Sequence, residues 1–179
     1  VLVKKNYVGR LAPSPTGALH LGNARTFLIA WARARLSGGR LLLRMEDLDH
    51  PKVKAAATGQ VLEDLRWLGI DWDEGPDRPG TSGSYTQSER IEFYAEALKR
   101  LHEAHLAYPC ICSRADVEAA QSAPHPGDSL FYSGACRDRF SSFDQAAALL
   151  PDGRIPAWRF KVPAGTRIEF TDGFCGACS

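Results

Sequence analysis

The sequence contains no long hydrophobic run and carries almost no net charge. None of its 179 residues belongs to an apolar stretch of the roughly 18 residues that a membrane-spanning helix needs. The first seven residues include Lys4 and Lys5 but no apolar core with a small-residue cleavage site, so we expect no secretory signal. The net charge is only +1. A nucleic-acid partner would therefore have to meet a local basic patch.

Internal repeats and low-complexity tracts are also lacking. Hydrophobic residues make up 44% of the chain and charged residues 24%, a composition typical of globular proteins. The length fits one large domain or two small ones. With five cysteines and no export signal, we expect a cytoplasmic protein. In that reducing compartment, clustered cysteines are metal ligands more often than disulfides.

The beginning of the chain has a pattern typical of a nucleotide site. A short apolar lead ends at Arg10, a turn rich in proline and glycine follows, and residues 24–36 have helical spacing. This order predicts a strand, a tight loop and a helix whose N-terminal N–H groups suit a phosphate. His20 would donate a hydrogen bond to an oxyanion, and Gly22 would allow close approach. Spacing alone leaves open a capped turn that binds nothing.

The following segments extend an α/β pattern. Leu41–Leu43 predicts a buried strand, and the charged run 44–49 follows at its carboxyl end, where ligands of open α/β sheets bind. The alternative is a solvated turn in which Asp49 caps the next helix. We further predict helices over 52–68 and 89–105, short strands over 70–72 and 106–108, and a surface loop over 73–84. The order predicts an α/β, doubly wound parallel sheet.

The character of the chain changes at Pro109. The predicted elements after it are a helix capped by Ser113, a helix over 142–150, and two strands over 158–162 and 167–170 joined by a turn. We therefore divide the chain into an α/β part over 1–109 and a small α+β insertion over 110–179.

Five motifs occur here in the order found in glutamyl-tRNA synthetases, which are class I enzymes. They are Arg10-Leu11-Ala12-Pro13-Ser14-Pro15-Thr16-Gly17, His20-Leu21-Gly22-Asn23, Arg44-Met45-Glu46-Asp47-Leu48-Asp49, Asp73-Glu74-Gly75-Pro76 and Tyr85-Thr86-Gln87-Ser88-Glu89-Arg90. The sequence resembles this family from about Val8 to Phe170. The resemblance implies a Rossmann-like catalytic core, of which this sequence holds the N-terminal half.

The resemblance also implies how glutamate would be bound. Arg10 would pair with a carboxylate of the substrate, since its planar fork suits bidentate contacts. Ala12 and Ser14 would line the amino-acid pocket. Glu46 would accept the α-ammonium, so that opposite charges grip the two ends of the substrate.

ATP would be bound by the second motif. In the family, the residues matching His20, Gly22 and Asn23 hold the phosphates, and His20 is the expected catalytic residue at the α-phosphate. Magnesium would accompany ATP, held mainly by phosphates and waters. The implied reaction forms glutamyl-adenylate and pyrophosphate, followed by transfer of glutamate to RNA. Asp47 and Asp49 would orient Arg44 or cap a helix.

A cysteine pattern resembles the zinc site of truncated paralogues in this family. Their ligands are a Cys-x-Cys pair, a tyrosine and a cysteine four residues after it, which correspond here to Cys110, Cys112, Tyr132 and Cys136. Three thiolates and one phenolate make a closed tetrahedral set, so the expected zinc is structural. Full-length zinc-bearing enzymes of the family place a histidine just beyond the last cysteine, where this sequence has basic residues.

Other ligand sets remain open from the residues alone. Cys175 and Cys178 form a second pair near the C-terminus and would complete a four-cysteine site with Cys110 and Cys112. His125 lies in the intervening loop and is another candidate. The alternative without a metal is that Cys110 and Cys112 are free thiols at the end of a strand.

The truncated paralogues attach glutamate to queuosine in the anticodon loop of tRNA(Asp), and the resemblance implies that activity here. The second half of the family's nucleotide fold and its lysine-rich KMSKS-like loop are not in this sequence. We therefore interpret the sequence as the N-terminal part of such an enzyme, monomeric when complete. The alternatives are part of a discriminating synthetase that charges tRNA(Glu), and a non-catalytic zinc-containing RNA-binding module.

Overall fold

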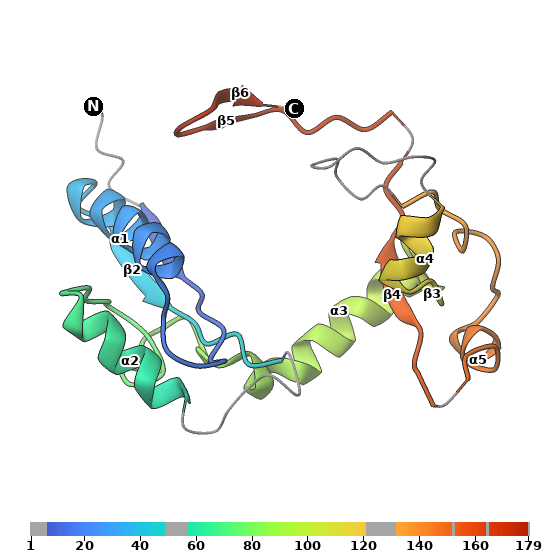
Figure 1. Cartoon of the computed structure of the whole chain (residues 1–179), viewed down its shortest axis with the longest axis horizontal. Coiled ribbons are helices and arrows are strands. Elements are labelled where there is room, and N and C mark those ends of the chain that lie inside the picture. The colour runs from blue at the N-terminus through green and yellow to red at the C-terminus, as the bar shows by residue number, and fades with distance from the viewer. Residues whose placement is uncertain (1–6, 49–56, 121–131, 152, 164, 179) are drawn as a thin grey trace. The chain divides into compact units, whose positions relative to one another are not determined.

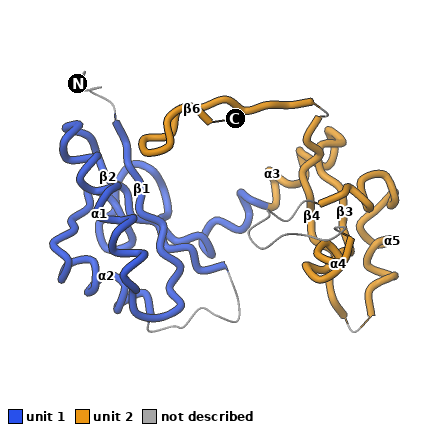
Figure 2. Tube along the Cα trace, turned by 45° about the horizontal axis from the view of Figure 1, so that its top comes forward, with its two compact units in different colours: residues 1–94 blue, residues 95–179 orange. Residues whose placement is uncertain are grey.

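A computed structural model of the chain describes residues 7–48, 57–120, 132–151, 153–163 and 165–178. The chain divides into two compact units, residues 1–94 and 95–179 (Figure 2). Within the described ranges, no helix combines the length and the apolar character that crossing a membrane requires.

The first unit is built on a parallel pair of strands. Strand β1 (Val8–Leu11) pairs with β2 (Arg40–Leu43), and helix α1 (Leu21–Leu36) connects them (Figure 1). The predicted strand, tight loop and helix are confirmed, as is the buried strand at Leu41–Leu43. Helix α1 begins three residues earlier than expected, because His20 caps it.

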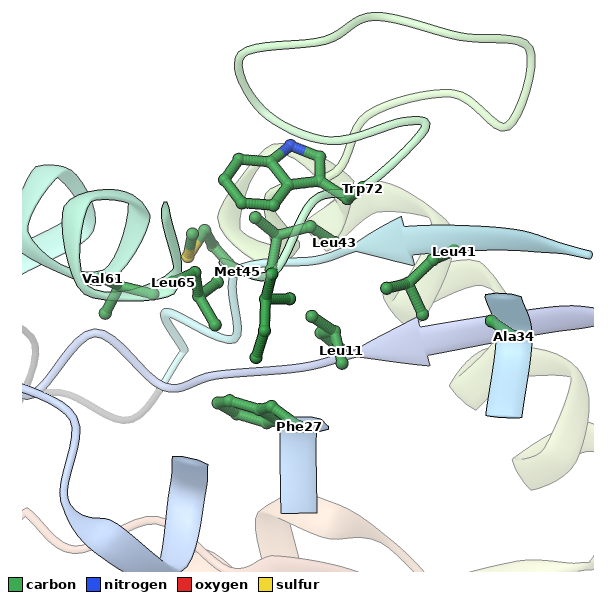
Figure 3. Packing of buried hydrophobic residues seen from close by; sticks show 10 residues of the cluster. Leu11, Phe27, Ala34, Leu41, Leu43, Met45, Val61, Leu65 and Trp72 are labelled. Carbon is green, nitrogen blue, oxygen red and sulfur yellow. The ribbon is translucent and has the colours of Figure 1, made fainter. Parts of the chain in front are cut away.

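The core of the first unit lies between this pair of strands and two helices. Helix α2 (Ala57–Trp67) contributes Val61 and Leu65, which lie beside Met45 in Figure 3. The buried cluster consists of Leu11, Phe27, Ala34, Leu41, Leu43, Met45, Val61, Leu65, Ile70 and Trp72. The part of the predicted second helix before Ala57, together with the expected cap at Asp49, lies outside the described residues.

The predicted third strand over 70–72 is wrong. Ile70 and Trp72 are core residues, and the pairing with β2 falls just beyond them: Asp73 N–H donates to the Leu41 carbonyl, and Leu43 N–H donates to the Glu74 carbonyl. Strand β2 therefore lies between β1 and the segment at Glu74. The predicted surface loop over 73–84 is also wrong at its beginning, because Asp73 and Glu74 pair with β2 and the Glu74 side chain is buried.

A buried carboxylate explains why this segment is not a free loop. Glu74 accepts hydrogen bonds from the Tyr85 hydroxyl, from Ser82 Oγ at 2.8 Å and from the Arg40 guanidinium. The first of these, the Tyr85 bond, contributes most to lowering the pKa of Glu74, so the group stays ionised although its residue is only 6% exposed. The side chain ties both ends of the segment to β2.

The division between the two units, after Tyr94, falls within a helix. A 3₁₀ turn, η1 (Gln87–Arg90), leads into α3 (Ile91–Glu103), close to the helix predicted over 89–105. Its amphipathic spacing predicts a buried stripe, yet no residue of α3 is buried by the described part of the chain. Ile91 is 53% exposed.

The second unit contains an antiparallel pair of strands. Strand β3 (Ala107–Cys110) pairs with β4 (Ala157–Phe160). Helix α4 (Arg114–Ala119) follows its predicted cap Ser113, and α5 (Phe143–Ala147) lies within the helix predicted over 142–150. The predicted strand over 106–108 is thus present, but it does not extend the parallel sheet of β1 and β2. The compositional change at Pro109 falls inside β3, and the proposed division at that residue stays a prediction.

The last strand prediction is also wrong in its partner. Instead of a strand over 167–170 beside β4, strands β5 (Phe170–Asp172) and β6 (Gly176–Cys178) form their own hairpin. The reason is local: Asp172 Oδ1 accepts from the backbone N–H groups of Phe174 and Cys175, each at 2.8 Å. An aspartate that bonds the backbone ahead of it favours a tight turn.

Candidate functional site

The backbone ladder between β1 and β2 continues beyond both strands. Arg44 N–H donates to the Leu11 carbonyl and Glu46 N–H donates to the Pro13 carbonyl, each at 2.9 Å. The turn after β1 therefore lies directly beside the acidic run that follows β2. Two motifs that are distant in the sequence are brought together by these bonds.

Side-chain alternation sorts this region into two faces. Leu11, Leu43 and Met45 have no exposed surface and point into the core. Because successive side chains of extended backbone point to opposite faces, the residues offset by one from these lie on the other face. Three of the four residues expected to bind glutamate belong to that set, namely Arg10, Ala12 and Glu46. The fourth, Ser14, is exposed between the buried Pro13 and Pro15.

The acidic run is held by two different partners. Arg44 Nη2 lies 2.5 Å from Glu46 Oε1, and the two side chains are partly exposed. Asp47 accepts from the backbone N–H of Ser88 at 2.9 Å and from its hydroxyl at 2.5 Å. Asp47 thus bonds the first turn of η1, and its expected roles of orienting Arg44 or capping the next helix stay predictions.

His20 is fixed at the start of α1 by two bonds. Its Nδ1 accepts from the Gly22 N–H at 3.1 Å, while the Asn23 side-chain oxygen accepts from the His20 N–H at 3.2 Å. Since Nδ1 accepts, the neutral imidazole carries its proton on Nε2, and this N–H is available as a donor. A Cβ at Gly22 would come within 3.0 Å of the imidazole Cε1, so glycine is needed for this close packing.

A cavity of about 260 Å³ lies over the turn and the first turns of α1. Its lining includes Ala12 and Ser14, from the expected glutamate set, and His20 and Asn23, from the expected ATP set. Arg10, Glu46 and Gly22 do not line it. The structure thus brings four of the expected site residues to one cavity and places Arg10 and Glu46 on the adjoining sheet face.

A separate cluster of sulfur atoms lies in the second unit. The Sγ atoms of Cys110, Cys112 and Cys136 all lie within 4.8 Å of one another, and those of Cys112 and Cys136 are 3.6 Å apart. The Tyr132 hydroxyl oxygen lies 3.3 Å from Cys110 Sγ and 4.0 Å from Cys112 Sγ. Cys110 and Cys136 are each only 1% exposed.

These separations fit a tetrahedral zinc site. Zn–S bonds of about 2.3 Å place two ligand sulfurs about 3.7 Å apart, and a ligand oxygen lies slightly closer to each sulfur. Among the described residues, no cysteine from the C-terminal hairpin belongs to the cluster. Cys175 is exposed, and His125 lies outside the described residues. The geometry therefore favours the tyrosine-containing set over the four-cysteine alternative.

The protonation of the cluster is uneven. Burial raises the pKa of the Cys112 thiol to about 11, and it also raises the pKa of Tyr132. Burial opposes ionisation of Cys136 as well, but hydrogen bonds from the Ile111 backbone and from neighbouring side chains outweigh it and lower the pKa of Cys136 to about 7. The metal-free cluster thus favours one thiolate, and a bound dication would release further protons.

Comparison with known families shows to which family the chain belongs. Residues 7–179 match the family described as tRNA synthetases class I (E and Q), catalytic domain. The chain belongs to this family. The resemblance seen in the five motifs is confirmed, and the two motifs joined by the β1–β2 ladder lie in a class I synthetase catalytic domain.

The chain is similar in sequence to curated proteins that carry two different names. The Glutamyl-Q tRNA(Asp) synthetase of Symbiobacterium thermophilum is 49% identical, over 94% of this chain and 52% of its own length. The protein of the same name from Nitratidesulfovibrio vulgaris is 46% identical, over 94% of this chain and 51% of its own length. The Glutamate–tRNA ligase of S. thermophilum is 44% identical, over 91% of this chain and 34% of its own length. The chain spans about half the length of the first two relatives.

A solved synthetase shares the fold. The glutamate tRNA ligase of Elizabethkingia meningosepticum, determined in complex with its amino acid, superimposes with a TM-score of 0.71 and is 30% identical. The likeness covers 98% of this chain and 36% of that protein. The family match and the structural likeness thus both extend over nearly the whole chain.

One contact in this synthetase chain was not expected from the sequence. Asp64 of α2 accepts the backbone N–H of Leu19 through Oδ2 at 2.8 Å, and it accepts Gln60 Nε2 through Oδ1 at 2.8 Å. It thereby holds the turn one residue before His20. No sequence signal separates this acid from others on the surface of a helix.

Proposed function

We propose that the chain supplies the glutamate- and ATP-binding residues of a ligase that forms glutamyl-adenylate and transfers glutamate to queuosine in the anticodon loop of tRNA(Asp). The observation that carries this proposal is the 49% identity, over 94% of the chain, to a protein named Glutamyl-Q tRNA(Asp) synthetase. The geometry of the first unit supports glutamate and ATP as the two small substrates.

Glutamate would be recognised on the open sheet face. The Arg10 side chain forms no hydrogen bond or ion pair with the described residues and is exposed, so its guanidinium is free to take a substrate carboxylate in a bidentate contact. Glu46 is held by Arg44 through Oε1, which leaves Oε2 to accept the α-ammonium. Ala12 and Ser14 would contribute from the adjoining cavity that they line. An amino acid with an acidic side chain matches this set.

ATP would be bound where α1 begins. The first turn of α1 carries no acidic residue, so the positive end of its dipole is not neutralised. His20 offers its Nε2–H, and Asn23 lines the same cavity. Gly22 would act through its packing against His20. No protein nucleophile is required, because positioning and charge stabilisation at phosphorus suffice for adenylate formation. Magnesium would reach the site with the phosphates.

A structural zinc would be held by Cys110, Cys112, Tyr132 and Cys136. The separations of the four ligand atoms match a closed tetrahedral set, which has no position for a substrate. When bound, the metal would tie the end of β3 to the segment over 132–136. Its role would be to stabilise the second unit rather than to take part in catalysis.

The second candidate is a ligase that charges tRNA(Glu). It is favoured by the 44% identity to a Glutamate–tRNA ligase and by the fold of the Elizabethkingia enzyme. Both candidates share the same glutamate and ATP residues. They differ only in the RNA that receives glutamate.

Glutamate-dependent pyrophosphate exchange by the full-length protein separates the candidates. The proposal expects exchange without any tRNA, and transfer of labelled glutamate only to tRNA(Asp) that contains queuosine. Exchange that requires tRNA, with charging of tRNA(Glu), would establish the second candidate instead. A protein that supports no exchange under either condition would contradict both.

A further inference from the structure

Arg159 of β4 reaches two of the four residues of the sulfur cluster. Its Nε donates to Cys110 Sγ at 3.2 Å, and its guanidinium carbon lies 3.8 Å from the centre of the Tyr132 ring. One side chain therefore makes a directional hydrogen bond to one proposed zinc ligand and a cation–π contact with another.

The strand register explains this placement. Arg159 is paired with Tyr108 across the antiparallel ladder, and Cys110 lies two residues further along β3. Residues two apart on a strand share a face, so Arg159 and Cys110 lie on the same face of the β3–β4 pair. The backbone pairing of β3 with β4 thus places the Arg159 side chain beside the cluster.

The net charge of a zinc-loaded site explains why an arginine would be placed beside it. Three thiolates and a phenolate around Zn²⁺ leave two negative charges in excess, in a place where two of the cysteines are almost fully buried. Arg159 forms no ion pair with a carboxylate among the described residues, and both partners named above are ligand side chains. Arg137, which follows Cys136, directs its guanidinium to the Val162 carbonyl instead.

We infer that Arg159 is a positioning residue of the zinc site, which offsets the excess negative charge and orients Cys110 and Tyr132 for coordination. The inference rests on the proposed zinc site. Residues that hold metal ligands in this way commonly change metal affinity by about 10- to 100-fold when they are replaced. A lysine would keep the charge but would lose the planar stacking and the fixed direction of the donor.

Zinc affinity of the full-length protein tests the inference. We expect Arg159→Met to weaken zinc binding by about 10- to 100-fold in competition with a chromophoric chelator, and Arg159→Lys to weaken it by a smaller factor. Replacing zinc with Co²⁺ adds a spectroscopic signature, because the sulfur-to-cobalt charge-transfer band should shift in Arg159→Met. The matched control is Lys161→Met, which removes one positive charge nearby from a lysine that pairs with Asp138 at 2.6 Å. We expect its affinity to stay within about twofold.

The outcomes separate the inference from the proposal beneath it. If the unaltered protein binds no zinc, the proposed zinc site is wrong and the inference is overturned with it. If the unaltered protein binds zinc and Arg159→Met binds it equally well with an unchanged cobalt spectrum, the site stands and the inference is overturned. Should Arg159→Met fail to fold in saturating zinc, Arg159→Lys decides: a weakened affinity supports the inference, and an unchanged one overturns it.

Discussion

The two units of the chain are stabilised by different chemistry. The first has a core of aliphatic and aromatic side chains from two strands and two helices. In the described part of the second unit, no leucine, isoleucine, valine or phenylalanine is buried, and the central cluster contains Tyr108, Cys110 and Cys136. Small units that bury little apolar surface are commonly stabilised by a crosslink or a metal, which is the role proposed for zinc here. The comparison teaches that one synthetase chain can combine a hydrophobic core with a core organised around sulfur.

The largest expected effect is that of metal removal, which should destabilise the second unit and leave the first unit folded. A zinc chelator, or Cys136→Ser, is expected to abolish amide protection in β3 and β4 while leaving β1 and β2 protected, because binding of structural zinc contributes about 10–16 kcal/mol in zinc-finger peptides. Hydrogen exchange followed by mass spectrometry measures both regions at once, and metal analysis should give one zinc per chain before treatment. Equal protection in both units after zinc loss would show that the second unit does not depend on the metal.

The converse experiment removes apolar volume from the first unit. Leu43 is fully buried, so Leu43→Ala should lower the free energy of unfolding of this unit by about 2–5 kcal/mol, measured by denaturant titration. Zinc content should not change. Leu42→Ala is the neighbouring control: it removes the same atoms from the opposite, partly exposed face and should cost less. Loss of zinc in Leu43→Ala would mean that the two units are coupled.

A smaller effect is expected at the contact between α2 and the turn before His20. Asp64→Ala removes the acceptor of the Leu19 N–H and should raise the KM for ATP in pyrophosphate exchange by about tenfold, which corresponds to roughly 1.4 kcal/mol. Glu63→Ala is the control, since this exposed neighbour has no such bond. An unchanged KM in Asp64→Ala would show that the turn is held by its other contacts.

The smallest expected effect concerns acid stability of the first unit. The Trp31 indole N–H, at 2.6 Å, and then Arg35 lower the pKa of Asp71 against the opposing effect of burial. A lowered folded-state pKa adds stability above the unfolded value near pH 4, and this stability is lost as the pH falls through the folded-state value. Because the Asp71 side chain is 63% exposed, we expect a contribution below about 1 kcal/mol. Asp71→Asn should therefore flatten the fall in stability between about pH 5 and 3; an identical pH profile would contradict this role.

Local features of the fold could be predicted from the sequence, whereas distant pairings could not. The helix cap at Ser113 and the apolar run of β2 are signals within a few residues and were found where expected. Strand β3 looked like the next parallel strand, but nothing near it indicates that its partner is β4, far along the chain. The apolar spacing of α3 predicts that the helix has a hydrophobic face, but it does not indicate which other segment covers that face.

The same distinction applies to the sites. The proposed zinc ligands could be named because their local spacing resembles a family motif, and the glutamate and ATP residues because they lie within three short motifs. The bond of Asp64 to the Leu19 N–H and the contacts of Arg159 with Cys110 and Tyr132 could not be predicted, since each connects residues that are remote in sequence. The burial of Glu74 was missed for the same reason: its partners Tyr85, Ser82 and Arg40 are brought to it only by the sheet.

The alternation of side chains along the segment from Arg10 to Ser14 has a consequence for how this protein can change over time. Insertion or deletion of a single residue there would exchange the two faces, turning Leu11 outward and carrying Arg10 or Ser14 toward the core. Substitutions alter one contact, but a change of length reverses all of them together. The spacing of this segment should therefore tolerate variation less than the identity of any residue within it.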